Sequence, residues 1–255
     1  MSKGKTLWKL LRLWRWLKKR LTPNRTIRMD ISALRLSPTC QLPLLLHFYE
    51  KYLPRLGTFV EIGAYDGESF SNSSCLADAG WTGNYVEPVP EYARKCEARH
   101  ARNRVKVFNL AISDTDGMLD LNVGEAFTTA SSDALSAYRG IEWSKATAFD
   151  QKISVRAMTL DKFLLMNAIA IGFDLLIVDV EGFEEKVLGT FDLGYWRPKM
   201  LIVELNDYHA DFVAQATIQM SARRVREKLL AASYMQVYAD AINTIFVHDS
   251  TRLNW

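Results

Sequence analysis

Cysteine is scarce in this chain of 255 residues, and its three cysteines, Cys40, Cys75 and Cys96, form no CxxC pair. An odd number of widely spaced cysteines argues against a disulfide scaffold and a structural zinc site, and it is typical of a reducing, cytoplasmic setting. We expect Cys75 and Cys96 to be buried, unreactive thiols. The sequence also lacks a run of about 20 apolar residues, so no transmembrane helix is expected.

Acidic residues are absent from residues 1–28, which hold ten lysines and arginines. The remaining residues contain 22 basic and 29 acidic side chains, so the net charge of +3 hides a basic tail on a mildly acidic body. Binding to a nucleic-acid backbone requires clustered lysine and arginine. The body is therefore not expected to bind nucleic acid.

Residues 6–21 are predicted to form a helix, because leucines and Trp14 fall on one arc and basic residues fall on the other. Pro23 ends this helix. Basic residues within the segment interrupt the apolar core that a signal peptide needs. We expect residues 5–21 to lie on an anionic membrane surface, at the inner face of the membrane. The alternatives are a helix that docks on a partner protein and a tail that is disordered when free.

Residues 30–255 alternate between strand and helix patterns, which predicts one α/β domain with a mostly parallel sheet and helices on both faces. Strands are expected at residues 58–62, 83–87, 105–110, 175–179 and 200–204, and an antiparallel hairpin at 235–239 and 244–247. Helices are expected at 43–52, 72–79, 90–100, 184–189 and 222–232. Residues 117–157 form a long irregular insert, with short strand candidates at 118–122 and 153–156.

A glycine bend follows the first strand, in the segment FVEIGAYDGES of residues 59–69. Gly63 and Gly67 let the backbone approach a ligand closely, and Glu61 and Asp66 place carboxylates beside the bend. Such a loop suits a cationic ligand with amino and hydroxyl groups better than a pyrophosphate, which needs bare N–H groups. Glycine bends of this kind also arise for purely structural reasons.

Glu87 stands at the end of the second strand, 24 positions after Gly63. An acid in this place accepts hydrogen bonds from ribose hydroxyls in dinucleotide folds, although it is also a common solvated loop residue. The third glycine of a GxGxxG motif is missing, because Ser69 and Phe70 stand in that region. This absence argues against the alternative of a nicotinamide-dependent sugar oxidoreductase.

Oxygen-bearing side chains follow two neighbouring central strands, Asp179 and Glu181 after one, Glu204 and Asn206 after the other. Strand ends of this kind face the crevice where ligands bind in open α/β sheets. Asp179, Glu204 and Asn206 are candidate ligands for Mg²⁺. Alternatively, Asp179 only binds a cofactor or caps the next helix.

His209 is the best histidine candidate for a general base, because it closely follows Asn206. With Asp179 and Glu181 it completes the set of candidate catalytic residues. A histidine in a loop is nevertheless more often without a catalytic role. Aromatic residues in and near the insert either line an acceptor pocket or pack the insert, and the sequence does not decide between these roles. They are Tyr138, Trp143 and Tyr208.

Several motifs in a fixed order resemble the FkbM family of S-adenosylmethionine-dependent methyltransferases. They are VEIGAYDG (60–67), AGWTG (79–83) leading to VEP (86–88), AISD (111–114) followed by Gly117, MTLD (158–161), DLLIVDVEGFE (174–184), and RPK (197–199) with VELN (203–206). The resemblance covers roughly residues 58–206, and the first 30 residues lie outside it. The order and spacing of these motifs make the resemblance far more specific than the glycine bend alone.

The resemblance implies a Rossmann-like sheet of seven strands that ends in the antiparallel hairpin, and S-adenosylmethionine as cofactor. In that family the bend wraps the methionine end of the cofactor. The resemblance therefore implies that this part of the cofactor is contacted by Glu61, Gly63, Asp66 and Gly67, with Ala64 and Ser69 as further contacts. Glu87 would hold the ribose next to Pro88. Ala111, Ile112 and Ser113 would border the adenine, and Asp179 is also a cofactor candidate. Glu61 departs from the family, because many relatives have aspartate there.

The implied activity is O-methylation of a hydroxyl on a glycan, a lipid-linked sugar or a polyketide-like metabolite. A hydroxyl acceptor needs a base or a metal to take its proton. If residues 5–21 bind a membrane, a lipid-linked sugar is the favoured acceptor. The alternative from another class is a catalytically silent, cofactor-binding scaffold attached to the membrane.

Overall fold

The computed structural model describes residues 45–142 and 144–251. The predicted helix at residues 6–21 and its membrane contact lie outside the described residues, as do Cys40 and Trp143. Within the described ranges, no helix is both long and apolar enough to cross a membrane.

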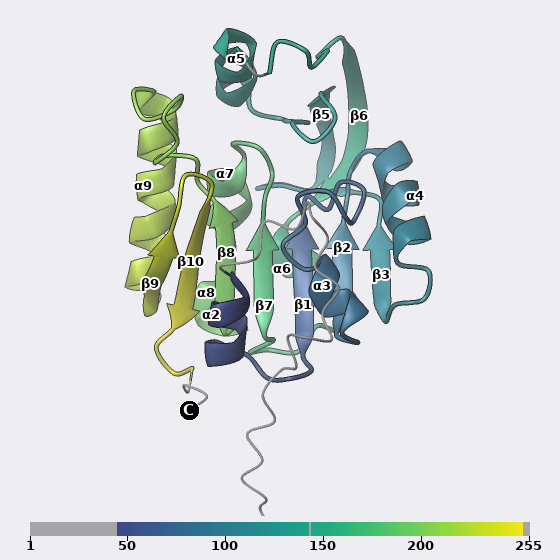
Figure 1. Cartoon of the computed structure of the whole chain (residues 1–255), viewed down its shortest axis with the longest axis vertical. Coiled ribbons are helices and arrows are strands. Elements are labelled where there is room, and N and C mark those ends of the chain that lie inside the picture. The colour runs from purple at the N-terminus through teal and green to yellow at the C-terminus, as the bar shows by residue number, and fades with distance from the viewer. Residues whose placement is uncertain (1–44, 143, 252–255) are drawn as a thin grey trace, which may run out of the picture.

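A seven-stranded sheet forms the centre of the molecule (Figure 1). Its strands, in spatial order, are β3 (Val105–Phe108), β2 (Thr82–Val86), β1 (Thr58–Ile62), β7 (Leu175–Val178), β8 (Met200–Glu204), β10 (Asn243–His248) and β9 (Tyr234–Ala239). The first five are parallel, and β10 is antiparallel to both of its neighbours. This confirms the predicted mostly parallel sheet with a C-terminal antiparallel hairpin.

The register of the central strands brings their carboxyl ends level. Ile62 at the end of β1 pairs with Val86 of β2 and with Val178 of β7, and Val178 pairs in turn with Val203 of β8. Strands β7 and β8 are buried along their whole length, which explains their nearly unbroken apolar sequences. Residues that directly follow these strands therefore meet at one edge of the sheet.

Helices cover both faces of the sheet, as predicted. One hydrophobic core joins the sheet to α6 (Leu160–Met166), α7 (Glu184–Gly189), α8 (Leu193–Trp196) and α9 (Ala216–Ala231). The other core joins it to α2 (Leu45–Tyr52), α3 (Ser74–Asp78) and α4 (Pro90–Arg99). Cys75 and Cys96 are buried free thiols in this second core, in agreement with the sequence. Helix α9 begins earlier than predicted, whereas α6 and α8 were not predicted.

The insert is regular rather than irregular, although the two strands predicted within it, at residues 118–122 and 153–156, are present. Its strands β5 (Gly117–Val123) and β6 (Gln151–Met158) pair antiparallel along their length, and β4 (Ala111–Ile112) pairs with β6 in the same small sheet. Helix α5 (Ser132–Gly140) lies between these strands in sequence, and its first turn is capped by Ser131, which accepts a hydrogen bond from the Ala134 amide.

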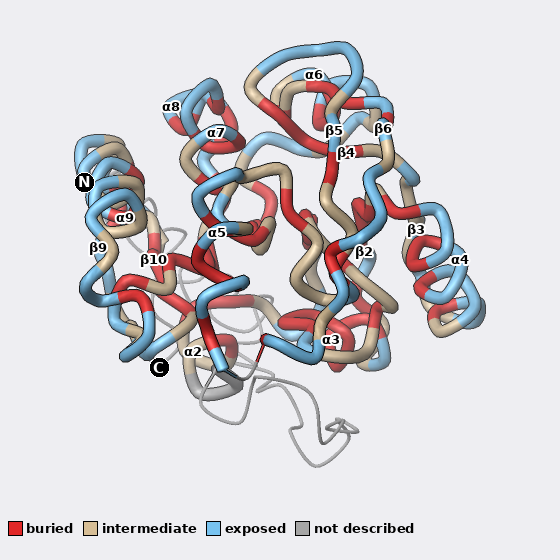
Figure 2. Tube along the Cα trace, turned by 90° about the horizontal axis from the view of Figure 1, so that it is seen from above, coloured by how far each residue is buried: buried red, intermediate tan, exposed pale blue. Residues whose placement is uncertain are grey.

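The insert lies over the carboxyl edge of the central sheet. Figure 1 shows α5, β5 and β6 beyond the tips of the central strands. In the view from above, α5 crosses the middle of the molecule (Figure 2). The polar strand ends are therefore enclosed between the sheet and the insert.

Candidate active site

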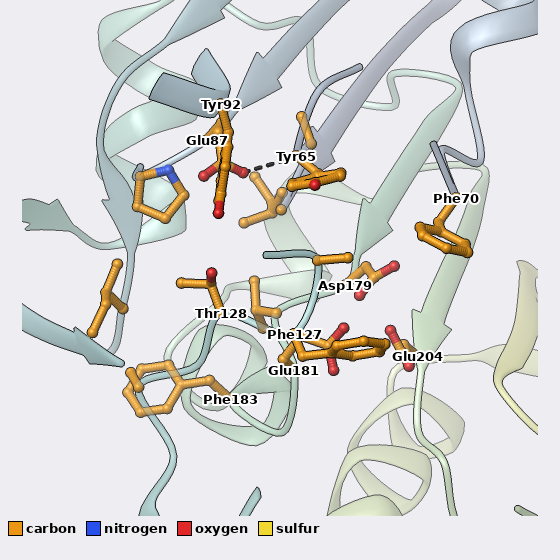
Figure 3. Close-up of a pocket in the computed structure, with 18 of the residues that line it drawn as sticks. Tyr65, Phe70, Glu87, Tyr92, Phe127, Thr128, Asp179, Glu181, Phe183 and Glu204 are labelled. Carbon is orange, nitrogen blue, oxygen red and sulfur yellow. Dashed lines mark hydrogen bonds between the residues drawn. The ribbon is translucent and has the colours of Figure 1, made fainter. Parts of the chain in front are cut away.

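A cavity of about 420 Å³ lies between the carboxyl edge of the central sheet and the insert. Its size falls within the range of ligand-binding pockets, about 300–1,000 Å³. The ends of β1, β2, β7 and β8 form one side of it, and insert residues 125–128 form another. In Figure 3, Glu87 lies across this cavity from Asp179, Glu181 and Glu204.

The glycine bend opens into the cavity. Gly63 has a φ of +88°, and a Cβ placed there would lie 1.7 Å from the backbone oxygen of Asp179. Only glycine therefore allows the end of β1 to pass the end of β7. The amides of Gly63 and Ala64 both donate to the Val86 carbonyl, at 2.9 and 3.2 Å, which ties the bend to β2. Gly63, Ala64 and Ser69 all line the cavity, and their contact with a cofactor stays a prediction.

Asp66 and Gly67 are not among the cavity-lining residues, unlike the rest of the predicted bend. The Asp66 carboxylate accepts hydrogen bonds from the amides of Glu68 and Ser69, at 2.9 and 2.7 Å, and so shapes the loop. Gly67 packs over the buried His100 ring, whose Nε2 lies 2.7 Å from the Gly67 carbonyl oxygen. These two residues hold the bend in position from behind.

Glu61 lies at the floor of the cavity and is 2% exposed. Its carboxylate accepts hydrogen bonds from the hydroxyls of Ser71 and Ser73 and from the amide of Asn72. Burial outweighs these hydrogen bonds and raises the pKa of Glu61 to about 7. The glutamate, longer than the aspartate of many relatives, is thus held by the segment that leads into α3.

Glu87 projects from the end of β2 into the same cavity. Its two carboxylate oxygens accept hydrogen bonds from the amides of Tyr65 and Val89, each at 2.8 Å (Figure 3). Burial raises the pKa of Glu87 to about 8. The rings of Tyr65 and Tyr92 meet edge to face beside it, 4.7 Å between centroids. This arrangement fixes one carboxylate where hydroxyl groups of a ligand can donate to it.

The wall predicted to border an adenine is apolar. Ala111 and Ile112 line the cavity together with Pro88, Leu119 and Leu121, and their contact with an adenine stays a prediction. Ser113 is not among the lining residues: its amide donates to the Met158 carbonyl and its hydroxyl donates to Asp114. An apolar wall beside Glu87 suits a flat heterocyclic ring next to a ribose.

Three carboxylates meet at the other end of the cavity, at the ends of β7 and β8. One oxygen from each of Asp179, Glu181 and Glu204 lies within 4.8 Å of the others. Burial raises the pKa values of Asp179 and Glu181 well above their usual range, and the nearby charge of Glu204 raises them further. We call this group the acidic cluster. It will hold either protons or a cation.

The loop after β7 is built around Glu184, one of whose carboxylate oxygens accepts hydrogen bonds from the amides of Val180 and Gly182, at 3.0 and 3.2 Å. Burial raises the pKa of Glu184 to about 8. Glu181 and Asn206 adopt positive φ angles of 54° and 56°, conformations that cost about 1–3 kcal/mol each and concentrate at functional sites.

Hydrogen bonds from other elements hold the acidic cluster in place. Asn206 donates through Nδ2 to Glu204 at 2.7 Å. Tyr138 of α5 donates through its hydroxyl to the Glu181 carboxylate, and the Thr129 hydroxyl donates to the Glu181 carbonyl at 2.7 Å. The insert is thereby attached to the cluster. The sequence left open whether Tyr138 lines a pocket or packs the insert, and the structure shows both, because its ring also contacts Phe212.

His209 lines the cavity with the acidic cluster, and its ring packs against Phe212. Its role as a general base stays a prediction. Tyr208 is 57% exposed and lies under Arg226, outside the cavity lining. Sequence reasoning missed several lining residues, because nothing in their local pattern distinguishes them from packing residues. They are Tyr65, Tyr92, Phe127, Thr128 and Phe183.

The folded protein is expected to lose stability as pH rises from about 5 to about 8. The pKa values of Glu61 and Glu87 are raised from 4.5 to about 7 and about 8, so in this window the folded state holds protons that the unfolded chain has released. The contribution of these two groups to the free energy of unfolding is therefore complete below about pH 4.5. It is lost as the pH rises through their folded-state pKa values. Urea unfolding measured across this range tests the slope. Glu87→Gln, which cannot ionise, should flatten it, and an unchanged slope would contradict the assignment.

A family model described as "Methyltransferase FkbM domain" matches residues 61–235. The solved structure of methyltransferase FkbM from Methylobacillus flagellatus KT is similar with a TM-score of 0.45 and 12% identity, and the match covers 75% of this chain and 43% of that chain. An O-methyltransferase from Bacillus cereus in complex with SAH gives a TM-score of 0.39 and 16% identity, covering 97% and 92% of the two chains.

The O-methyltransferase TomG from Streptomyces achromogenes, in complex with SAM, is similar with a TM-score of 0.39 and 14% identity, covering 80% of this chain and 77% of that chain. No curated protein matches the chain in sequence. The match to the family model extends over more than half of the sequence. The chain therefore belongs to the FkbM methyltransferase family.

Proposed function

We propose that the protein transfers a methyl group from S-adenosylmethionine to a hydroxyl of a glycan, a lipid-linked sugar or a polyketide-like metabolite. One observation carries the proposal: a single cavity at the carboxyl edge of the sheet holds Glu87 at one end and the acidic cluster at the other. The first end suits the ribose of a nucleoside and the second suits a hydroxyl that must lose a proton. Membership of the FkbM family supports methyl transfer.

The residues present fit the cofactor. Glu87 would accept hydrogen bonds from the ribose hydroxyls, and the apolar wall of Ala111 and Ile112 would contact the adenine. The open glycine bend, with Glu61 below it, would contain the methionine part. Carboxylates around the cavity also favour a positively charged sulfonium.

The acidic cluster suits the acceptor. When bound, S-adenosylmethionine supplies a methyl group on a positively charged sulfur. The acidic cluster would hold the acceptor hydroxyl, and Asp179 or Glu181 would take its proton as the oxygen gains the methyl group and the donor sulfur keeps the electron pair. Burial and the neighbouring Glu204 raise the pKa values of both groups, so either carboxylate, once ionised, is a stronger base than an ordinary carboxylate.

A magnesium ion at the acidic cluster is a second candidate. The sequence indicated Asp179, Glu204 and Asn206 as ligands, and the structure brings the Glu181 carboxylate to the same place. Mg²⁺ prefers oxygen ligands and retains several waters. It would neutralise the charges that now oppose one another, and it would lower the pKa of a bound hydroxyl.

Calorimetric titration is expected to show binding of S-adenosylmethionine and S-adenosylhomocysteine and none of NAD. At pH 9, above the Glu87 pKa of about 8, Glu87→Gln should weaken the binding of both adenosyl compounds about 10- to 100-fold, because a hydrogen bond to a charged acceptor contributes about 1.5–3 kcal/mol. Glu97→Gln, on the exposed surface of α4, is the matched control and should bind as the wild type does. Binding of NAD alone would favour the oxidoreductase instead.

The acceptor is best sought by incubating extracts with enzyme and cofactor and searching by mass spectrometry for the mass gain of one methyl group. A protein that binds the cofactor but methylates nothing in a broad panel of hydroxyl compounds would be the silent scaffold.

Removing residues 1–24 is expected to release the protein from anionic liposomes. The deleted segment contains most of the basic residues of the tail, and each basic residue near an anionic membrane contributes about 1 kcal/mol of binding. Cosedimentation with liposomes containing phosphatidylserine measures the effect, with neutral liposomes as the control. Unchanged binding after deletion would exclude a membrane role for this segment and remove the preference for a lipid-linked sugar.

A further inference from the structure

The cavity between the sheet and the insert is lined by ionisable groups of one kind. Six lining side chains are carboxylic acids, and no lysine or arginine of the described residues lines it. They are Glu61, Glu87, Glu125, Asp179, Glu181 and Glu204. A pocket lined by one sign of charge concentrates ligands of the opposite sign and repels those of the same sign. The cavity therefore favours cations and offers a phosphate or carboxylate group no positive side chain as a partner.

S-adenosylmethionine accounts for only part of this acidic lining. It carries two positive groups, the sulfonium and the α-ammonium, and one carboxylate. In the proposed function its methionine part lies at the glycine bend, with Glu61 below, and its ribose lies at Glu87. The acidic cluster stands across the cavity from Glu87 (Figure 3). Its three carboxylates therefore remain available to the acceptor.

Glu204 is buried in the acidic cluster without a positive partner. It is 8% exposed and lies beside Asp179 and Glu181 (Figure 3). Outside the cluster, Asn206 is the one described residue that donates a hydrogen bond to its side chain, and no described lysine, arginine or histidine forms a salt bridge with it. Removing a carboxylate from water without a counter-charge is unfavourable. A cation bound in the cavity would offset this cost.

The spacing of the acidic cluster suits an ammonium group. One oxygen from each of its three carboxylates lies within 4.8 Å of the others. A primary ammonium group has three N–H donors, and charge-assisted bonds of about 2.8 Å at tetrahedral angles place three acceptors about 4.6 Å apart. One nitrogen can therefore donate to all three carboxylates at once.

Aromatic rings stand next to the acidic cluster. Tyr138 donates its hydroxyl to Glu181, and the centroid of its ring lies 5.5 Å from that of Phe127 and 5.8 Å from that of Phe212. All three rings line the cavity. The faces of aromatic rings attract ammonium groups, and their carbon surface covers the apolar body of a ligand. The surroundings of the cluster thus suit an ammonium group carried on an apolar or ring-shaped body.

We infer that the acceptor carries a primary ammonium group, that the acidic cluster binds this group with Glu204 as a main partner, and that phosphate or carboxylate groups are rejected at this place. The inference rests on the proposed function and narrows it to amine-bearing acceptors. The ammonium group takes the place of Mg²⁺ in the second candidate, and it likewise offsets carboxylates that oppose one another. The hydroxyl that receives the methyl group then lies next to it.

Three probes that share one ring test the charge of the acceptor. Benzylamine, benzyl alcohol and benzoate present an ammonium, a hydroxyl and a carboxylate at neutral pH. Each is titrated by saturation-transfer NMR into the full-length protein loaded with S-adenosylhomocysteine, with EDTA present to remove metal ions. Glu204→Gln removes the charge but keeps an oxygen that can accept from Asn206, and Glu97→Gln on the exposed surface of α4 is the matched control.

Benzylamine is expected to bind the wild type and Glu97→Gln at least about tenfold more tightly than benzyl alcohol does, and benzoate should not bind. Glu204→Gln should weaken benzylamine binding about tenfold and leave the affinities for benzyl alcohol and S-adenosylhomocysteine unchanged. The inference is overturned if benzylamine does not bind, if benzyl alcohol or benzoate binds the wild type as tightly as benzylamine, or if Glu204→Gln behaves like Glu97→Gln. Failure of S-adenosylhomocysteine to bind the wild type would instead overturn the proposed function, and with it the inference.

Discussion

Replacing Asp179 by asparagine is expected to lower the rate of methyl transfer about 10²- to 10⁴-fold, the usual contribution of a general base. Asparagine keeps the size and hydrogen-bonding shape of the side chain but cannot take a proton. The affinity for S-adenosylhomocysteine should change far less, because Glu87 and the glycine bend are untouched. Single-turnover rates and calorimetry on the same preparation separate the two effects, and Glu97→Gln is the control.

Metal removal and the pH dependence of the wild-type rate separate the two candidate roles of the acidic cluster. If Mg²⁺ is bound there, EDTA should abolish turnover of the wild type and added Mg²⁺ should restore it. If the cluster acts as the base, EDTA should have no effect, and the rate should rise with pH as Asp179 and Glu181 lose their protons. Full turnover by Asp179→Asn would refute a central role for this carboxylate.

Gly63→Ala is expected to lower the free energy of unfolding by about 2–5 kcal/mol, the sum of a left-handed backbone conformation and an overpacked contact. The added methyl group would lie 1.7 Å from the Asp179 carbonyl oxygen, at the junction of β1 and β7. Cofactor binding should be lost as well, because the displaced strand ends carry both the bend and the acidic cluster. Urea denaturation followed by circular dichroism measures the change in stability.

Gly189→Ala provides the matched control. This glycine is the last residue of α7, and a Cβ there meets no atom of the described residues within 4 Å. The substitution should leave stability unchanged or raise it by up to about 1 kcal/mol, because alanine favours the helix. If Gly63→Ala were as stable as this control, the close approach of β1 and β7 would not be required for folding.

The parts of the fold that follow from local pattern were predictable from the sequence. Strands β7 and β8 are apolar because both faces are buried, and this also placed Asp179 and Glu204 at neighbouring strand ends. Parallel strands align their carboxyl ends, so the acidic cluster could be anticipated. The resemblance to the FkbM family added the order of the motifs, and the match to the family model agrees with it.

Features that depend on contacts between distant segments were not predictable. Tyr138 lies 43 residues before Glu181, and their hydrogen bond exists only because α5 folds over the sheet edge. Helix α5 is short and weakly patterned, so its sequence resembles a loop. Asp66 shows the complementary difficulty: the backbone turn directs its carboxylate to the loop amides, and the residue type alone does not reveal this direction.

The position of β10 between β8 and β9 has a consequence for synthesis of the chain. Strand β9 leaves the ribosome before β10, yet within the described residues its strand pairing is with β10 alone. It therefore waits without a hydrogen-bonded neighbour until residues 243–248 have emerged and inserted beside β8. A nascent chain that stops short of β10 leaves β8 as an exposed apolar edge open to pairing with other chains. Among the described strands, the one made last thus completes the sheet.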